Sequence, residues 1–273
     1  MDLYQIDNLT LSLADMTAKP LFGAAPRIDI LKGLSFTIPK GAVVGIVGGS
    51  GSGKSTLGRA LVRLLEPSGG AIRFDGTDIT HLSEPALRPM RRRFQMIFQD
   101  PMSSLNPRHR VGTIIAEPLR LHGMDAVPAR VARALDHVGL PQAFAARFPH
   151  ELSGGQRQRV GIARAIALEP DFILADEIVS GLDVSSQAQV LNLLERLVAD
   201  LGLTLAFISH DLSVVRHLCE RVVIMKSGEI IEEGPTAEVF AAPKTAFTQL
   251  LIDSIPLPEF RPGWLDSSPG LAP

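Results

Sequence analysis

Short apolar runs alternate along the chain with segments whose apolar residues recur at every third or fourth position. Five runs have the length and β-branched content of buried strands: residues 43–47, 94–98, 172–175, 203–209 and 221–225. Between them, residues 54–65, 157–168 and 185–201 show the helical period. This alternation predicts an α/β domain with a mainly parallel sheet flanked by helices.

Glycine and proline mark the limits of several predicted elements. Asp183 or Ser185 can cap the helix over residues 185–201, and Gly202 ends it. Residues 101–151 contain helical patterns but no strand pattern, which predicts a helical insert. The proline-rich residues 256–273 predict an extended or loosely ordered tail.

Candidate chemistry follows three of the predicted strands. Parallel sheets bind ligands beyond the carboxyl ends of their strands. Gly48 follows the first of these strands, Asp176 ends a second and His210 follows a third. We therefore expect these residues to share one edge of the sheet.

A glycine-rich loop between a predicted strand and a predicted helix matches the phosphate-loop pattern G-x-x-x-x-G-K-[ST]. Glycines allow backbone N–H groups to turn toward phosphates, and the helix N-terminus adds a positive dipole. Lys54 is placed to reach the terminal phosphates, and Ser55 offers a hydroxyl to Mg²⁺. The residues assigned to this nucleotide site are Gly48, Gly49, Ser50, Gly51, Ser52, Gly53, Lys54, Ser55 and Thr56.

Two adjacent carboxylates end the strand predicted at residues 172–175. Asp176 is placed to hold Mg²⁺, directly or through water, beside the Ser55 hydroxyl. Glu177 is placed to polarise the attacking water as a general base. Acidic strand ends are common, so the prediction depends on the neighbouring phosphate loop.

A second glycine-rich helix start, at residues 152–156, has no lysine of its own. Ser153 and the amides of Gly154 and Gly155 form an anion-binding helix N-terminus, or alternatively only a capped hinge. An anion site without a lysine is useful if it closes over a phosphate held by another subunit.

Composition narrows the function classes. The chain has 273 residues, a formal net charge of −2 and a single cysteine, Cys219. These values disfavour nucleic acid as a partner, exclude an internal disulfide framework and fit a reducing compartment. No apolar run reaches 18 residues and no signal peptide is recognisable at the N-terminus, so we expect a soluble chain that reaches a membrane only through a partner.

The run Leu-Ser-Gly-Gly-Gln at residues 152–156, lying between a phosphate loop and an acidic strand end, resembles the signature of ABC transporter nucleotide-binding subunits. The resemblance implies a P-loop NTPase core with an antiparallel β N-terminal subdomain and a helical subdomain, about residues 101–156, that bears the signature. It implies an ABC domain over residues 1–242 and a partly extended C-terminal extension over residues 243–273.

The resemblance also assigns roles to single residues. Gln99 matches the Q-loop glutamine, which contacts Mg²⁺ and faces the membrane partner, and His210 matches the switch histidine that contacts the γ-phosphate. Residues 180–183 resemble the D-loop, in which Asp183 follows the dimer interface. ATP and Mg²⁺ are the implied cofactors. The implied catalytic residues are Glu177, His210 and Gln99, the implied metal ligands are Ser55, Gln99 and Asp176, and Ser153, Gly154, Gly155, Gln156 and Asp183 join the phosphate loop at the nucleotide.

Two further segments, residues 98–108 and 239–256, resemble those of peptide and nickel importer ATPases. This narrower resemblance implies a peripheral ATPase at the cytoplasmic face of the inner membrane that energises import of peptides or a similar small solute. Its implied partners are a second ABC ATPase, identical or paralogous, integral membrane permease subunits and an extracytoplasmic solute-binding protein. A nickel or other solute importer, or an accessory ATPase of a soluble multi-enzyme complex, is the alternative. An ABC protein of DNA repair or translation and a phosphate-loop kinase are disfavoured.

Three positions depart from the family pattern. Ile178 stands in place of the usual proline, so we expect a looser turn with Asp176 and Glu177 still in place. Gly49 replaces a frequent glutamate. Leu13 stands where an aromatic residue usually stacks on adenine, unless Phe22 supplies the ring, which predicts weaker base discrimination.

Overall fold

The computed structural model describes residues 1–15, 23 and 25–255. Its strands are β1 (Asp2–Ala14), β2 (Arg27–Pro39), β3 (Val43–Gly48), β4 (Gly69–Phe74), β5 (Thr77–Asp78), β6 (Phe94–Ile97), β7 (Phe172–Asp176), β8 (Thr204–Ile208), β9 (Arg221–Lys226) and β10 (Glu229–Pro235). Its α-helices are α1 (Lys54–Leu61), α2 (Glu84–Arg91), α3 (Pro101–Ser104), α4 (Val111–Leu121), α5 (Val127–His137), α6 (Gly154–Ile166), α7 (Val184–Leu201), α8 (Leu212–Leu218), α9 (Thr236–Ala241) and α10 (Ala246–Asp253). Two 3₁₀-helices, η1 (Gln142–Ala146) and η2 (Pro149–Glu151), precede α6.

The strands form two sheets. The six-stranded sheet has the order β10-β9-β3-β8-β7-β6, in which β10 alone pairs antiparallel with its neighbour. The four-stranded sheet has the order β2-β1-β4-β5 and is antiparallel throughout. The predicted α/β fold, with its mainly parallel sheet and antiparallel N-terminal subdomain, is confirmed.

Side chains of the six-stranded sheet alternate between two hydrophobic cores. On one face, Val47, Ala175 and Phe207 pack with residues of α4 to α8. On the other face, Ile46 and Leu174 pack with α1 and the antiparallel sheet. Because helices or strands cover both faces, every residue of β3, β7 and β8 is buried, and all of them are apolar except Asp176 and Thr204 at strand ends.

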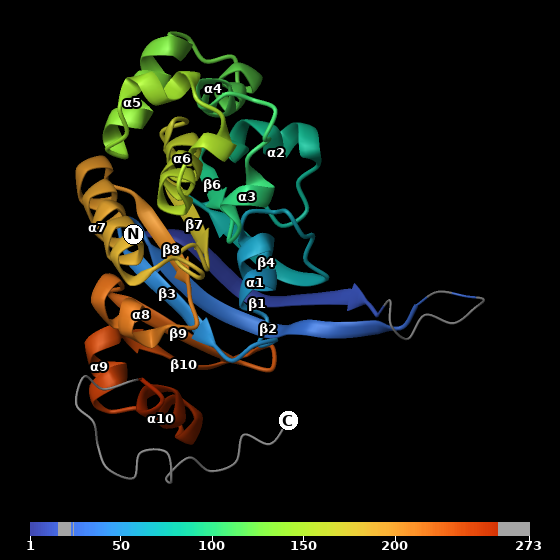
Figure 1. The fold of residues 1–273 in the computed structure, drawn as a ribbon. Coiled ribbons are helices and arrows are strands. Elements are labelled where there is room, and N and C mark those ends of the chain that lie inside the picture. Colours follow the sequence, from blue (N-terminus) through green and yellow to red (C-terminus); the bar gives the residue numbers. More distant parts are fainter. Residues whose placement is uncertain (16–22, 24, 256–273) are drawn as a thin grey trace, which may run out of the picture.

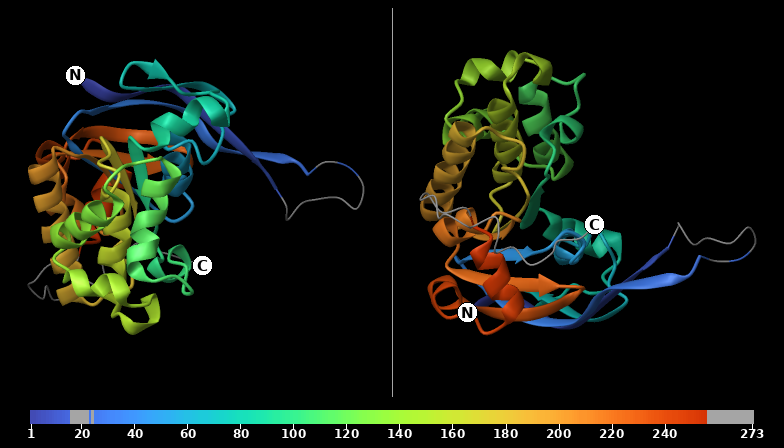
Figure 2. Two further views of the ribbon diagram at one scale, coloured as in Figure 1. Left: turned by 90° about the horizontal axis from the view of Figure 1, so that it is seen from above. Right: turned by 60° about the horizontal axis from the view of Figure 1, so that its bottom comes forward.

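The helical segment stands apart from the sheets. Figure 1 shows α4 and α5 gathered at the top of the molecule, with α6 leading from this lobe down to the six-stranded sheet. The long β1–β2 hairpin projects to one side, toward the right in Figure 1 and in both views of Figure 2. The predicted helical insert over residues 101–151 therefore corresponds to α3 through η2, all helical.

One arginine joins the two sheets near α2. The Arg93 guanidinium donates to Asp75, at the end of β4, and to Asp171, just before β7, both at 2.6 Å. It also lies over the Phe74 ring, 4.9 Å from the centroid. The hydrogen bond from Arg93 lowers the pKa of Asp75, and the two bonds together fix the antiparallel subdomain against the core.

One predicted boundary differs from the structure, and one predicted segment contains a helix. The helix predicted over residues 54–65 ends at Leu61, because Val62 leaves the helical conformation and Arg63 takes a positive φ of 52°. The predicted C-terminal extension begins with a helix, α10, whose Phe247 ring lies 4.9 Å from the Lys226 ammonium. The proline-rich tail and Phe22 lie outside the described residues.

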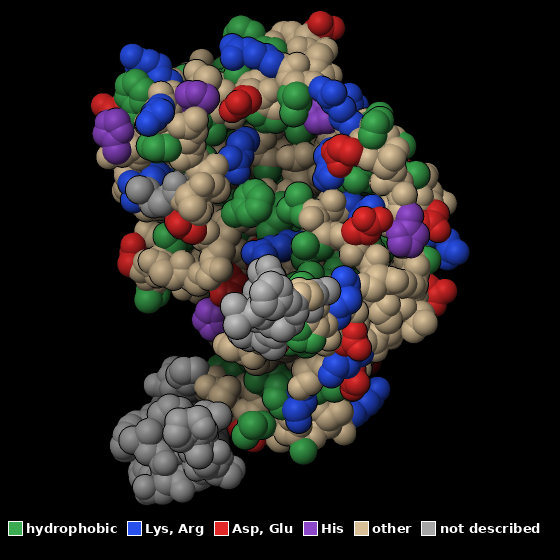
Figure 3. Space-filling view, turned by 90° about the vertical axis from the view of Figure 1, so that its right-hand side faces the viewer, with side chains coloured by type: hydrophobic (Ala, Val, Ile, Leu, Met, Phe, Trp, Pro, Cys, Tyr) green, Lys and Arg blue, Asp and Glu red, His purple; other side chains and the backbone are tan. Residues whose placement is uncertain are grey.

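The surface carries mixed charge on the face turned toward the viewer in Figure 3. Basic and acidic side chains are interspersed there, and no large area carries a single sign. Among the described residues, no helix is long and apolar enough to span a lipid bilayer.

Candidate nucleotide site

The phosphate loop joins the buried strand β3 to α1. Gly48 is packed so closely that an added Cβ would lie 2.2 Å from the carbonyl oxygen of Met225. Gly53 precedes α1 as its N-cap with a φ of 99°, in the left-handed region that favours glycine. Both positions therefore require glycine for reasons of backbone geometry, and the loop ends with helix amides directed toward it.

Lys54 is buried under this loop. Its ammonium donates to the carbonyls of Gly48 at 2.9 Å and Gly49 at 3.0 Å. Burial lowers the pKa of Lys54, and the carboxylates of Glu177 and Asp176 act in the opposite direction. A cation held in this way supplies the positive charge that a phosphate chain needs.

The buried hydroxyl of Ser52 also indicates that the loop fits a phosphate. Its side chain is 4% exposed, and its hydroxyl oxygen has no hydrogen-bond partner within the described part of the chain. Buried polar groups normally have partners. The buried hydroxyl and the neighbouring Lys54 ammonium are therefore donors suited to phosphate oxygens.

Asp176 and Ser55 form the oxygen pair predicted for Mg²⁺. Asp176 ends β7, is 3% exposed and accepts a hydrogen bond from the Ser55 hydroxyl at 3.0 Å. Burial raises the pKa of Asp176, and the Ser55 hydrogen bond partly opposes that rise. Carboxylate and hydroxyl oxygens are the ligands that Mg²⁺ prefers, so this pair fits the ion.

Glu177 lies where side chains from three strand ends converge. Its Oε2 accepts a hydrogen bond from the Gln99 amide at 3.2 Å and lies 3.5 Å from Nδ1 of His210. These residues follow β6, β7 and β8, which are neighbours in the sheet. The structure thus brings together the three side chains to which the family resemblance assigned catalytic roles.

The backbone of Glu177 is unusual, with a φ of 49°. Its N–H donates to the Ile208 carbonyl at 3.0 Å, and its carbonyl accepts from Ser180 N–H at 3.1 Å and Ser180 Oγ at 2.7 Å. A left-handed glutamate costs on the order of 1 kcal/mol or more, and these contacts hold it in place. The turn that Ile178 was expected to loosen is therefore closed by two hydrogen bonds, and the Ile178 side chain is buried in the core.

Sequence reasoning gave Ser180 no role of its own. Its hydroxyl lies 3.5 Å from the Gln99 amide, besides its bond to the Glu177 carbonyl. Its place at the start of the D-loop motif was the available signal.

The second glycine-rich helix start has the predicted Ser153 cap, while its binding of an anion stays a prediction. Ser153 caps α6, with Ser153 Oγ accepting the Gln156 N–H at 3.3 Å and Gln156 Oε1 accepting the Ser153 N–H at 3.0 Å. Around it, Gln99, Gly154 and residues 180–182 line a cavity of about 410 Å³ together with Asp100 and Arg157. The helix start thus lies beside the D-loop.

Asp183 acts as the N-cap of α7. Its carboxylate accepts the Ser186 N–H at 2.9 Å, and this hydrogen bond lowers the pKa of Asp183. Of the two caps that the sequence allowed, the structure therefore selects Asp183 over Ser185.

The proposed base contact lies on the projecting hairpin. Leu13 pairs with Ile28 across β1 and β2, and the two side chains are 39% and 48% exposed. The Ile30 carbonyl, further along β2, would lie 3.2 Å from a Cβ at Gly53. The strand that passes the phosphate loop thus also carries Ile28, which forms an apolar pair with Leu13. Weaker discrimination between nucleotide bases stays a prediction.

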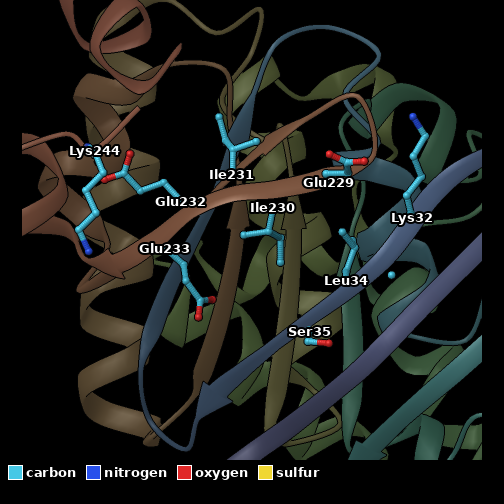
Figure 4. A pocket seen from close by; sticks show the side chains of 10 residues that line it. Lys32, Leu34, Ser35, Glu229, Ile230, Ile231, Glu232, Glu233 and Lys244 are labelled. Atoms are coloured by element: carbon cyan, nitrogen blue, oxygen red, sulfur yellow. Dashed lines mark hydrogen bonds between the residues drawn. The ribbon is translucent and has the colours of Figure 1, made fainter. Parts of the chain in front are cut away.

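A separate groove of about 560 Å³ lies between the edge strands β2 and β10 (Figure 4). Lys32 and Glu229 lie at one end, and Lys244 lies beside Glu232 at the other. The Glu232 carboxylate accepts the Lys244 backbone N–H at 2.9 Å. None of the residues assigned to the nucleotide lines this groove.

Comparison with known proteins assigns the chain to a family. The ABC transporter family model matches residues 31–180. The chain belongs to the ABC transporter family. A putative peptide import ATP-binding protein of Brucella ovis is 51% identical over 235 residues, which are 85% of this chain and 74% of that protein.

Other relatives of this ABC ATPase carry related names. The oligopeptide transport ATP-binding protein AppF of Bacillus subtilis is 50% identical over 238 residues, 86% of this chain and 72% of AppF. The glutathione import ATP-binding protein GsiA of Salmonella paratyphi A is 48% identical over 241 residues, which cover 87% of this chain and 39% of GsiA.

Solved structures agree with the fold of the ABC ATPase. The cassette MJ0796, in a dimeric post-hydrolysis state bound to ADP and Pi, has a TM-score of 0.74 and 30% identity over 85% of this chain and 98% of that one. The cbiO1 protein of Clostridium perfringens, part of the transporter complex cbiONQ, has a TM-score of 0.76 and 30% identity over 88% of this chain and 91% of that one.

Alanine substitutions at two neighbouring glycines of the ABC phosphate loop should have different effects on stability. Gly48→Ala places a Cβ against the Met225 carbonyl, so we expect a loss of about 1–3 kcal/mol in unfolding free energy. Gly49→Ala has open space around the new Cβ and is expected to stay within about 0.5 kcal/mol of the parent. Urea unfolding of both variants tests this, and equal losses would contradict the described packing.

Proposed function

We propose that this chain is the ATP-hydrolysing subunit that energises import of peptides or a similar small solute. The observation that carries the proposal is the contact of Glu177 Oε2 with both Gln99 and His210, next to the buried Lys54 loop. The import assignment rests on relatives at about half identity whose names state peptide or glutathione import.

The phosphate chain of ATP binds to the loop at residues 48–56. Lys54 exchanges its loop carbonyls for phosphate oxygens, and the amides at the start of α1 complete the cradle. Ser55, Asp176 and Gln99 would hold Mg²⁺, which neutralises charge on the phosphates when bound.

Hydrolysis requires a base and a group that senses the γ-phosphate. Glu177 orients and polarises the attacking water, and its carboxylate is held beside Gln99 and His210. His210, whose side chain is 65% exposed, turns from Glu177 to the γ-phosphate. Gln99 connects this cluster to the helical lobe.

The helix start at Ser153–Gly155 serves the nucleotide of a second ABC subunit. It has N-cap geometry and helix amides but no lysine, and it lies beside the D-loop rather than forming part of the phosphate loop. Two chains paired head to tail would each complete the other's site. The chain would reach the cytoplasmic face of the membrane by binding permease subunits, with a solute-binding protein completing the system.

Glu177→Gln tests the hydrolytic step. The amide keeps the shape of the side chain but cannot act as a base, so phosphate release should fall by a factor of about 100 or more. Affinity for a fluorescent ADP analogue should change by less than about twofold, because ground-state binding is retained. Glu195→Gln, a change on α7 where Glu195 contacts His217, serves as a control and should keep wild-type activity. Normal phosphate release by Glu177→Gln would refute the assignment.

The raised pKa of Asp176 predicts the pH dependence of metal binding. Mg²⁺ needs the ionised carboxylate, and a raised pKa means that Asp176 takes up a proton at a higher pH than an ordinary aspartate. The Mg²⁺-dependent gain in ADP affinity should therefore be complete at neutral pH and decline early on acidification. Titration calorimetry with and without Mg²⁺ measures the gain across pH. Asp176→Asn should show little gain at any pH, and a variant that matches the parent would contradict the role of Asp176.

A further inference from the structure

The signature helix α6 carries two arginines on one face, two turns apart. Arg157 donates to the Leu152 carbonyl at 2.8 Å, immediately before the Ser153 cap. Arg164 donates to the Ser104 carbonyl at 2.6 Å. One helix therefore holds the backbone before its own start and, near its other end, the backbone of α3.

The segment held by Arg164 is the one that follows Gln99. Ser104 ends α3, and its N–H donates to the Asp100 carbonyl at 3.2 Å. Four residues thus separate the Arg164 contact from Gln99, whose amide contacts the Glu177 carboxylate. Leu105, the next residue, is 2% exposed and belongs to the same core as α6, so the contact has a fixed support.

Placing the charged Arg164 side chain in this half-buried position costs desolvation free energy. The side chain is half-buried, burial lowers its pKa, and Glu117 supplies the opposing negative charge. A cation taken from water and directed at a backbone carbonyl holds its partner more firmly than a neutral donor does. Arg159, on another side of α6, instead donates to the Val138 carbonyl and the Gln189 amide oxygen, away from Gln99.

We propose that Arg164 is a positioning residue that couples the two nucleotide sites of the ABC pair. The inference rests on the proposed function, in which the first turn of α6 closes over the nucleotide of the opposite subunit. The same helix fixes, through Arg164 and Ser104, the segment that carries Gln99 to its own nucleotide. A shift of α6 on binding at one site therefore moves the glutamine that contacts Glu177 at the other site.

The test uses the full chain with Arg164→Ala, Arg164→Lys and Arg159→Ala. Phosphate release is measured against ATP concentration, and affinity for a fluorescent ADP analogue is measured separately. The parent should show a Hill coefficient well above 1. Arg164→Ala should lower the coefficient toward 1 and the maximal rate about tenfold, with ADP affinity changed less than about twofold. Arg159→Ala should keep the cooperativity of the parent.

Three results would overturn the inference. They are a parental Hill coefficient in Arg164→Ala, an equal loss of cooperativity in Arg159→Ala, and an unchanged maximal rate in Arg164→Ala. If Arg164→Ala does not fold, Arg164→Lys decides, because it keeps the charge but loses the planar fork. It should lower the Hill coefficient and speed hydrogen exchange of the amides of residues 103–106, and parental values of both would overturn the inference.

A failure of the proposed function gives a different result. The parent chain would then hydrolyse ATP with a Hill coefficient of 1 and would not associate with a second ABC subunit. That result would refute the proposal of a site shared by two chains. If the parent associates and is cooperative, and Arg164→Ala has the same Hill coefficient and maximal rate as the parent, only the role of Arg164 is refuted.

Discussion

The six-stranded sheet is buried on both faces, and this constraint fixes the place of the site residues that follow its strands. Along β3, β7 and β8, successive side chains enter opposite cores, so a register slip of one residue would move each apolar side chain to the other core. The parallel register pairs Ile46 with Ile208 and Ala175 with Ile97. The strands therefore end together, and Gly48, Asp176 and the residues after β8 and β6 meet at one edge.

Burial at this edge of the sheet shifts the pKa values of Lys54 and Asp176. Lys54 lies under a loop of backbone carbonyls, and Asp176 lies buried against Ser55. Burial shifts both pKa values in the direction that disfavours charge, and each group is placed to regain a charged partner from a nucleotide or its metal. Glu177, by contrast, is more accessible and is held by side chains from neighbouring strand ends, which suits a base that must receive a water molecule.

Much of this was accessible from the sequence. The phosphate loop, the acidic strand end and the Ser153 cap each require particular residue types at fixed spacing, and local chemistry determines them. Five strands of the six-stranded sheet were predictable because their uninterrupted apolar runs are short. The edge strand β10 was not predicted, because only two apolar residues stand among its glutamates. The ends of helices were harder to predict. Val62 and Arg63 fit the helical spacing of apolar residues, but α1 ends before them, at the left-handed turn of Arg63.

Other features depend on contacts distant in the sequence. The left-handed conformation of Glu177 follows from the Ile208 and Ser180 contacts, which no local pattern encodes. Arg164 looks like any charged helical residue until the fold brings Ser104 to it, 60 positions earlier in the chain. The antiparallel N-terminal subdomain was expected only through family resemblance, because the several register shifts between β1 and β2 blur the alternation of side chains.

The central claim is that the two glycine-rich helix starts of this chain serve two different nucleotides. Sedimentation of Glu177→Gln with saturating ATP tests it most directly, alone and combined with Gly154→Asp, in the presence of its ATPase partner. The account predicts an ATP-dependent gain in mass of one ABC subunit, lost on adding Gly154→Asp to both subunits while each chain still binds ATP. A chain that keeps its single-subunit mass at saturating ATP, or a Gly154→Asp change that abolishes ATP binding to the isolated chain, would contradict it.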